Sequence, residues 1–117
     1  MKKLTVYIAD DHTFVRKSMC RLLNTFERVG VVKDAANGKE LIQMIREKEP
    51  SAVFIDLEMP VMGGIEASRY IVSHFPEIKV LILTMHTEKI YVEKLVEIGV
   101  HGFLLKNDEP EEVEKAL

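Results

Sequence analysis

Short apolar runs alternate with helical stretches along the whole chain, and this alternation constrains the fold more than any other feature. Runs rich in aliphatic and β-branched residues predict strands, and after each run apolar residues recur with helical spacing. The predicted strands are residues 4–9, 31–35, 52–56, 79–84 and 102–106. Because strict strand–helix alternation is typical of a doubly wound α/β fold, we expect one parallel sheet with helices on both faces.

The stretches between these runs carry the start and stop signals of helices. Apolar residues of the first stretch form one helical stripe, which consists of Val15, Met19, Leu22, Leu23 and Phe26. Gly30 is expected to end this helix, and Pro50, Pro76 and Gly99 to end the next three. The acidic segment 108–112 opens a fifth helix that runs for only about two turns. We therefore expect one domain, residues 1–117, truncated within or just after that helix.

The composition excludes several classes of function. The chain has 16 basic and 19 acidic side chains and a formal net charge of −3, which argues against a nucleic-acid-binding surface on this domain itself. The single cysteine, Cys20, excludes an internal disulfide and a multi-cysteine metal site, and we expect it to be a half-buried structural thiol. No apolar run approaches the roughly 20 residues that span a membrane. The start of the chain is too short for a signal peptide, so we predict a cytoplasmic protein without membrane contact.

Polar residues of complementary chemistry stand where four of the predicted strands end. Asp10 and Asp11 follow the first strand, Asp56 ends the third, Thr84 ends the fourth and Lys106 ends the fifth. In a doubly wound sheet the carboxyl ends of the strands lie along one edge, where ligands bind. We therefore expect these side chains to meet at a common site.

The three carboxylates at this edge predict a bound cation. Clustered carboxylates repel one another and stay ionised at neutral pH when a cation neutralises them. Oxygen ligands favour Mg²⁺, which also accepts phosphate oxygens as ligands. Charge neutralisation and positioning are most of what phosphoryl transfer requires, and Lys106 and Thr84 are suited to contact phosphoryl oxygens. Because a carboxylate can itself be the nucleophile, we predict that Asp56 becomes an aspartyl phosphate.

Each of these residues also has an ordinary structural explanation. Asp10 and Asp11 are suited to cap the first helix. Thr84 and Lys106 are unremarkable at a strand end and near a turn. His12, next to the acid pair, is expected to be a neutral surface imidazole. The functional interpretation depends on the coincidence that all the acids, the hydroxyl and the ammonium stand at equivalent positions and together suit one chemistry.

In order and spacing these residues resemble the receiver domain of two-component response regulators. The matching features are the pair Asp10-Asp11, the D-x-x-M-P-x-M-x-G run from Asp56 to Gly64, Thr84 after an apolar strand, and Lys106 after GFLL. The segments DLEMPVMGG, LTMHTE and GFLLK are similar to those of regulators with a LuxR-type helix-turn-helix output. The resemblance covers essentially the whole chain. It implies a flavodoxin-like fold with five strands in the order 2-1-3-4-5, which the alternation alone permits but does not fix.

The resemblance implies a role for each residue of the candidate site. Asp56 would accept a phosphoryl group from a phosphohistidine on a sensor histidine kinase, and Lys106 would pair with the phosphoryl oxygens. Mg²⁺ would be bound directly by Asp11, Asp56 and the backbone carbonyl of Glu58. Asp10 would bind the metal mainly through a water molecule.

The resemblance also implies how the signal would leave the site. Thr84 would move toward the aspartyl phosphate on activation, and Phe103 stands at the position of an aromatic switch residue. The side chains of Glu58 and His86 occupy two variable positions that tune the access of water to the phosphoryl group. The surface of the fourth helix, fifth strand and fifth helix would then change its self-association, for example as a homodimer, or its hold on an output domain. DNA would be contacted only through such an output domain, which we expect to be absent from these 117 residues.

Three positions depart from the commonest pattern of this family. Asn107 follows Lys106 where proline is usual and a cis bond is frequent, and a non-proline cis bond costs about 3–4 kcal/mol. Met85 follows Thr84 where a small residue is more common, so its bulk is expected to narrow access to the site. Phe103 lacks a hydroxyl group, so any switch must act through packing.

Two functions from other classes compete with the phosphorylation switch. A hydrolase of the haloacid-dehalogenase type also uses a strand-end aspartate, Mg²⁺, threonine and lysine, but normally has a second aspartate two residues after the nucleophile, where this chain has Glu58. An interaction-only module usually lacks one of the acids or the lysine, and here all are present. The sequence therefore predicts a phosphoacceptor that assists its own phosphorylation and dephosphorylation, rather than an enzyme, and that relays the signal to transcription regulation.

Overall fold

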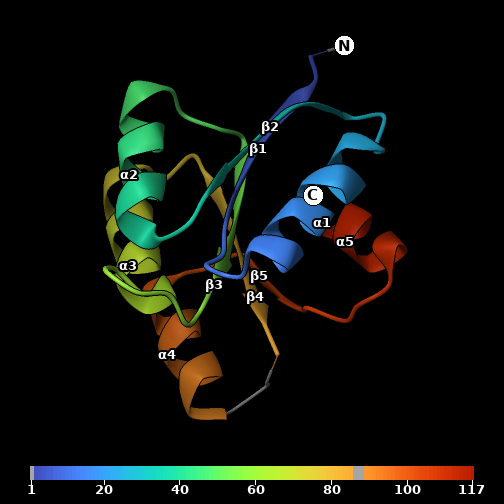
Figure 1. Ribbon diagram of the computed structural model, residues 1–117. Helices are drawn as coiled ribbons and strands as arrows, with labels where there is room; N and C mark the ends of the chain where they lie inside the picture. The colour runs from blue at the N-terminus through green and yellow to red at the C-terminus, as the bar shows by residue number, and fades with distance from the viewer. Residues whose placement is uncertain (1, 86–88) are drawn as a thin grey trace.

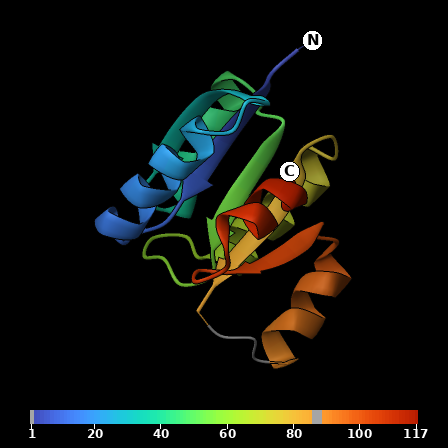
Figure 2. The ribbon, with the colours of Figure 1, turned by 90° about the vertical axis from the view of Figure 1, so that its right-hand side faces the viewer.

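The computed structural model describes residues 2–85 and 89–117, and these form one parallel sheet between two layers of helices (Figure 1, Figure 2). The sheet has five strands in the order β2-β1-β3-β4-β5, and each neighbouring pair is parallel. The strands are β1 Leu4–Ala9, β2 Val29–Ala35, β3 Ala52–Asp56, β4 Lys79–Thr84 and β5 Gly102–Leu105. The predicted fold class and strand order are confirmed.

The helices divide between the two faces of the sheet. They are α1 Thr13–Asn24, α2 Gly38–Glu47, α3 Gly64–His74, α4 Lys89–Ile98 and α5 Pro110–Ala116. Helices α1 and α5 cover one face, and α2, α3 and α4 cover the other (Figure 1). Within the described part of the chain, none of these helices has the length and apolar character needed to cross a bilayer.

Alternation along the central strands separates two hydrophobic cores. In β1, Val6 and Ile8 point toward α1 and α5, whereas Tyr7 and Ala9 point toward α2, α3 and α4. All four are essentially inaccessible, because β1 lies inside the sheet with helices on both sides. Cys20 is partly buried against the α1–α5 core, as expected for a structural thiol. The strand ends therefore emerge from a rigid, packed sheet.

The end of α1 differs from the sequence-based expectation. Gly30 was expected to end this helix, but α1 ends at Asn24 and Gly30 lies within β2. The reason is a local cap: the hydroxyl of Thr25 donates to the carbonyl of Leu22 at 2.6 Å, and the Thr25 amide donates to the same carbonyl at 3.0 Å. Gly30 instead allows the close approach of β2 to the segment before β1, because a Cβ at this position would lie 2.9 Å from the Cβ of Lys3.

The loop between β3 and α3 is held by close backbone approaches that require glycine. A Cβ on Gly64 would lie 2.3 Å from the carbonyl oxygen of Asp56, so α3 could not begin this close to the end of β3 with another residue. A Cβ on Gly38 would lie 2.6 Å from the carbonyl oxygen of Met62, which accepts a hydrogen bond from the Gly38 amide at 3.0 Å. In the loop between Asp56 and Gly64, Val61 adopts a left-handed conformation with φ of 69°. The packing of α2 and α3 thus fixes the loop that follows Asp56.

Candidate functional site

Three ionisable side chains from three strand ends meet at the carboxyl edge of the sheet. Asp10 directly follows β1, Asp56 ends β3 and Lys106 directly follows β5. The Lys106 ammonium lies 3.0 Å from Asp10 Oδ2 and 3.0 Å from Asp56 Oδ1. The three side chains are only 0%, 5% and 7% exposed, respectively. Residues 96 positions apart in the sequence (106 minus 10) therefore share one buried ionic cluster.

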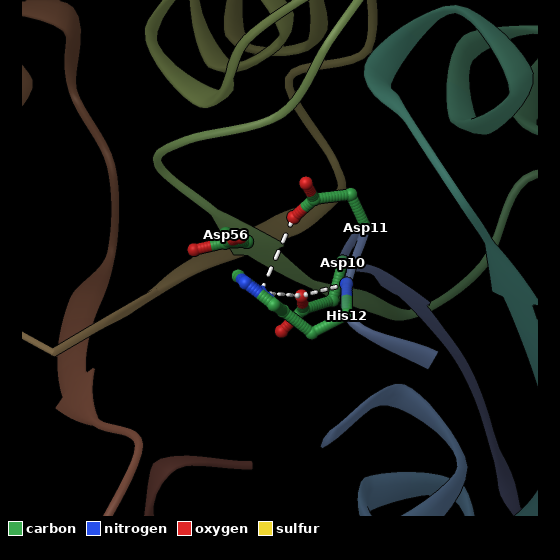
Figure 3. A group of neighbouring side chains, drawn as sticks. All are labelled: Asp10, Asp11, His12 and Asp56. Atoms are coloured by element: carbon green, nitrogen blue, oxygen red, sulfur yellow. Dashed lines mark hydrogen bonds and ion pairs between the residues drawn. The ribbon is translucent and has the colours of Figure 1, made fainter. Parts of the chain in front are cut away.

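Asp11 and His12 extend this cluster toward solvent. The His12 Nδ1 atom lies 3.2 Å from Asp10 Oδ1 and 3.3 Å from Asp11 Oδ1, and Figure 3 shows the imidazole turned toward both carboxylates. One possible ligand atom from each of Asp10, Asp11, His12 and Asp56 lies within 4.8 Å of all the others. His12 is 64% exposed, in agreement with the surface position expected for it, but it borders the acids rather than pointing away from them.

Burial and charge act together on the acid at the end of β3. Burial raises the pKa of Asp56 to about 6; the hydrogen bond from Lys106 opposes this, and the charges of Asp10 and Asp11 add to it. Burial alone would lower the pKa of Lys106, but its hydrogen bonds to Asp10 and Asp56 outweigh burial and raise the pKa. Two buried carboxylates thus share one ammonium, and the cluster lacks positive charge.

The donor set fits a hard divalent cation. Asp56 Oδ2 is buried and has no hydrogen-bond partner among the described residues. A buried carboxylate oxygen without a partner is costly, and a cation bound there would remove this cost. The atoms within reach are mostly carboxylate oxygens, which suit Mg²⁺ or a similar ion. Glu58 lies exposed in the loop two residues after Asp56, and the metal-binding role of its carbonyl stays a prediction.

The residues expected to form the switch lie on the β4–β5 side. Thr84 ends β4, is 8% exposed, and its carbonyl accepts a hydrogen bond from the Lys106 amide at 2.9 Å. Phe103 lies in β5 opposite Ile82 and packs, partly buried, against the core beneath α2, α3 and α4. Met85 follows Thr84 and is 64% exposed. His86, the other residue predicted to tune hydrolysis, lies outside the described residues.

The peptide bond after Lys106 has the ordinary geometry. No cis peptide bond occurs in residues 2–85 and 89–117, so Asn107 follows Lys106 through a trans bond. The loop is held in another way, because Asp108 Oδ2 accepts a hydrogen bond from the Leu105 amide at 2.8 Å. The lysine therefore reaches the acids without the proline that is usual in the family.

The acid pair does not act as a conventional helix cap. The residue that precedes α1 is His12, and its side chain makes no capping hydrogen bond. Asp10 Oδ1 instead accepts a hydrogen bond from the His12 amide at 2.9 Å, closing a tight turn between β1 and α1. The capping explanation therefore does not account for the buried carboxylate of Asp10, whose other oxygen faces Lys106.

Sequence reasoning missed one residue that contacts the site. Arg16 is 13% exposed and donates a hydrogen bond from Nη1 to the carbonyl of Asp10 at 2.8 Å. Its Nε also donates to Asp34 Oδ2 at 2.7 Å. The signals available were a basic residue one turn into the helix and an acid near the end of an edge strand. Their pairing depends on how α1 lies across β2, which the sequence pattern does not reveal.

Comparisons with known proteins agree with this geometry. A family model described as "Response regulator receiver domain" matches residues 6–117. The transcriptional regulatory protein YhcZ of Bacillus subtilis, whose description calls it uncharacterized, is 36% identical over 112 residues, which cover 96% of this chain and 52% of the relative. The response regulator UvrY of Escherichia coli is 33% identical over 114 residues, which cover 97% of this chain and 52% of UvrY. The chain thus spans about half the length of these curated relatives.

Solved structures show the same likeness. A two-component response regulator of the LuxR family from Aurantimonas is 33% identical and superimposes with a TM-score of 0.89, covering 97% of this chain and 81% of that one. A DNA-binding response regulator of the LuxR family from Staphylococcus aureus is 31% identical, with a TM-score of 0.90 and coverage of 97% and 94%. Together, the match across residues 6–117, the strand order and the acid–lysine cluster show that the chain belongs to the response regulator receiver domain family.

Proposed function

We propose that this domain is a phosphorylation switch in which Asp56 accepts a phosphoryl group from a phosphohistidine of a sensor histidine kinase. One observation carries the proposal: the two oxygens of the buried Asp56 carboxylate differ. Oδ1 lies 3.0 Å from the Lys106 ammonium, whereas Oδ2 has no hydrogen-bond partner in the described part of the chain. The second oxygen is therefore available to a metal ion or a phosphoryl group. Family membership supports the same chemistry.

The transfer follows from the charges around Asp56. A carboxylate oxygen of Asp56 attacks the phosphorus atom, the P–N bond to the donor histidine breaks, and the leaving imidazole takes a proton from solvent. Lys106, already within ion-pair distance of Asp56, neutralises part of the charge on the phosphoryl oxygens. Asp11, Asp56 and the Glu58 carbonyl would hold Mg²⁺, with Asp10 acting mainly through a water, and the bound ion would supply the remaining positive charge.

Two side chains are proposed to set the lifetime of the aspartyl phosphate. Glu58 is exposed in the loop after β3, where its side chain can influence the approach of water. His86, two residues after Thr84 in the sequence, has the same proposed role. Loss of the phosphoryl group by hydrolysis returns the domain to its starting state. We therefore regard the domain as a phosphoacceptor that assists its own phosphorylation and dephosphorylation, and not as a turnover enzyme.

The phosphoryl group is proposed to shift the balance between two conformations. Thr84, at the end of β4, would move toward the phosphoryl group, and Phe103 in β5 would repack, so that the α4–β5–α5 surface changes. Such a shift requires that the phosphoryl group binds one conformation more favourably than the other. We propose that this surface forms a homodimer or holds an output domain that binds DNA, in line with the transcriptional regulators among the relatives, and that the switch operates in the cytoplasm.

The proposed acceptor is tested by labelling with a small phosphodonor in the presence of Mg²⁺. Asp56→Asn is expected to lose the label, because an amide oxygen cannot form the acyl phosphate. Asp108→Asn is the matched control: this aspartate lies outside the cluster, and an asparagine oxygen can still accept the hydrogen bond from the Leu105 amide. It should be labelled like the wild type. Undiminished labelling of Asp56→Asn, or a label mapped to another residue by peptide mass spectrometry, would contradict the assignment.

A further inference from the structure

We infer that Arg16 is a positioning residue for the proposed cation site, which it shapes by fixing the Asp10–Asp11 peptide while Asp34 holds it in place. Arg16 lies in the first half of α1, on the side that faces the end of β1 and the edge strand β2. Within residues 2–85 and 89–117, Arg16 makes no hydrogen bond or ion pair with Asp56 or Lys106. The inference rests on the proposed function, since it concerns the cation that Asp56 would use.

The backbone amide, the backbone carbonyl and Oδ1 of Asp10 are held by hydrogen bonds, and Oδ2 faces the Lys106 ammonium. Its amide donates to the carbonyl of Ala35 at 3.1 Å, which continues the ladder between β1 and β2. Its carboxylate accepts from the His12 amide at 2.9 Å and faces Lys106 at 3.0 Å. The remaining group is the Asp10 carbonyl, and the Arg16 guanidinium donates to it at 2.8 Å. Arg16 thus completes the fixation of this residue from the helix side.

The carbonyl of Asp10 matters because it belongs to the peptide unit that leads to Asp11. A peptide unit is planar, so fixing the carbonyl oxygen also fixes the direction in which the chain continues. That direction decides where the Asp11 carboxylate points, and this carboxylate is 33% exposed and receives no contact from Lys106 in the described structure. Without Arg16 the peptide between Asp10 and Asp11 would be free to rotate. The Asp11 carboxylate would then no longer be directed toward the carboxylates of Asp10 and Asp56.

Asp34 orients the guanidinium for this task. Arg16 Nε donates to Asp34 Oδ2 at 2.7 Å while Nη1 donates to the Asp10 carbonyl, so the planar group spans both partners with separate N–H donors. Burial by itself would raise the pKa of Asp34, but hydrogen bonds from Lys17 and Arg16 outweigh it and lower the pKa. The acid therefore stays ionised and keeps its hold on Arg16 at neutral pH. A lysine at position 16 has no planar fork with which to reach both partners in this geometry.

Lys17 provides a matched control for charge. Its ammonium lies 2.9 Å from the same Asp34 oxygen, and among the described residues Asp34 is its partner, with no contact to Asp10. Removing either cation takes one positive charge away from the neighbourhood of the acid cluster. On electrostatics alone, both changes would leave the binding of a divalent cation unaltered or make it tighter. If Mg²⁺ binds more weakly to Arg16→Ala but not to Lys17→Ala, the loss therefore shows that Arg16 positions the metal ligands.

The test measures the Mg²⁺ dissociation constant by isothermal titration calorimetry for the wild type, Arg16→Ala, Arg16→Lys and Lys17→Ala. Residues that orient metal ligands typically contribute 10- to 100-fold to affinity, so we expect about tenfold weaker binding for Arg16→Ala. Arg16→Lys should be intermediate, and Lys17→Ala should bind Mg²⁺ at least as tightly as the wild type. At saturating Mg²⁺, labelling of Arg16→Ala by the small phosphodonor should return to the wild-type extent.

The outcomes separate this inference from the proposed function. Equal Mg²⁺ affinity in Arg16→Ala and Lys17→Ala would overturn the inference while leaving the acceptor assignment intact. If Arg16→Ala does not fold, as judged by thermal unfolding without metal, Arg16→Lys decides the question, and wild-type affinity in that variant would overturn the inference. A wild-type protein that neither binds Mg²⁺ nor becomes labelled would instead refute the proposed function.

Discussion

Two ionic clusters at the same edge of the sheet use the same kinds of side chain in opposite balance. At the end of β2 one carboxylate, Asp34, meets two cations, Arg16 and Lys17, at 2.7 and 2.9 Å. In the centre two buried carboxylates, Asp10 and Asp56, share the Lys106 ammonium at 3.0 Å from each. The outcome for the acids is opposite, because the pKa of Asp34 is lowered and that of Asp56 is raised to about 6.

Only one of these two clusters has its acid neutralised by the basic side chains around it. The edge cluster neutralises its acid, and its charges are partly screened by water, so it is suited to hold Arg16 in place rather than to bind a ligand itself. The central cluster is buried and short of positive charge, which is unfavourable in the isolated fold and favourable for capturing a cation or a phosphoryl group. This contrast predicts opposite effects on stability when acids are removed from the two clusters.

Removing the central cation should have the largest effect. Lys106→Met leaves two buried acids without compensation, and breaking a buried ion pair in this way costs about 3–5 kcal/mol of unfolding free energy. Urea denaturation at pH 8 without Mg²⁺ measures the loss. Lys115→Met is the control, because Lys115 is 75% exposed and its ion pair with Glu112 is expected to contribute little. Equal stability of the two variants would contradict the claim that the buried acids depend on Lys106 for charge compensation.

Removing a central acid should stabilise the metal-free protein. The folded-state pKa of Asp56 is about 6 and its ordinary value is 3.8, so ionisation opposes folding above about pH 6. At pH 8 without Mg²⁺ we expect Asp56→Asn to be more stable than the wild type by about 2 kcal/mol. A difference of one in pKa corresponds to about 1.4 kcal/mol, and partial relaxation of the structure around the ionised acid reduces the total.

The stability difference between Asp56→Asn and the wild type should depend on pH. The advantage of Asp56→Asn should shrink as the pH falls from about 6 toward 4, because the wild-type acid then becomes protonated in the folded state and the penalty disappears. Added Mg²⁺ should also remove the advantage by stabilising the wild type. Urea denaturation curves at several pH values measure both effects. Asp56→Asn less stable than the wild type at pH 8 would contradict a charge deficit in the centre.

Removing the edge acid should have the reverse and smaller effect. Asp34→Asn is expected to destabilise the protein by up to about 1 kcal/mol at pH 7, since its partners are partly exposed. The pKa of Asp34 lies below its ordinary value of 3.8, so the stabilisation is fully present above that pH and is lost as the pH falls through the lowered pKa. Thermal unfolding should therefore show a smaller difference in stability between the wild type and Asp34→Asn at pH 3 than at pH 7.

Removing one of the two edge cations should have the smallest effect. In Lys17→Ala, Arg16 still holds Asp34, so a loss of only a few tenths of a kcal/mol is expected. Comparison of its urea midpoint with that of Asp34→Asn measures how far the two cations are redundant. A loss in Lys17→Ala as large as that in Asp34→Asn would show that the edge cluster has no surplus of positive charge.

The central cluster could be predicted from the sequence, and the edge cluster could not. The position of Asp10, Asp56 and Lys106 follows from strand alternation, because every strand of a parallel sheet delivers its end to the same edge. The meeting of these three side chains depends little on where each helix begins. The order of the strands came from the family resemblance, since alternation alone permits several orders.

The contact between Arg16 and Asp34 depends on details that no periodicity specifies. It requires the rotation of α1 about its axis and the register of β2 against β1, and both depend on tertiary packing. The same limit explains the error at Gly30, where the cap formed by Thr25 ended the helix earlier than the glycine signal indicated. The closeness of His12 to both acids was missed for a related reason, because it arises from the tight turn after β1.

The carboxyl titrations of Asp34 and Asp56, followed by NMR in one sample of selectively ¹³C-labelled protein, test the contrast most directly. Without metal we predict that Asp56 titrates near pH 6 and Asp34 below its ordinary value of 3.8. Saturating Mg²⁺ should lower the pKa of Asp56 and leave that of Asp34 in place. An Asp56 that titrates near 4 without metal and does not respond to Mg²⁺ would contradict the claim that a deficit of positive charge makes it the acceptor.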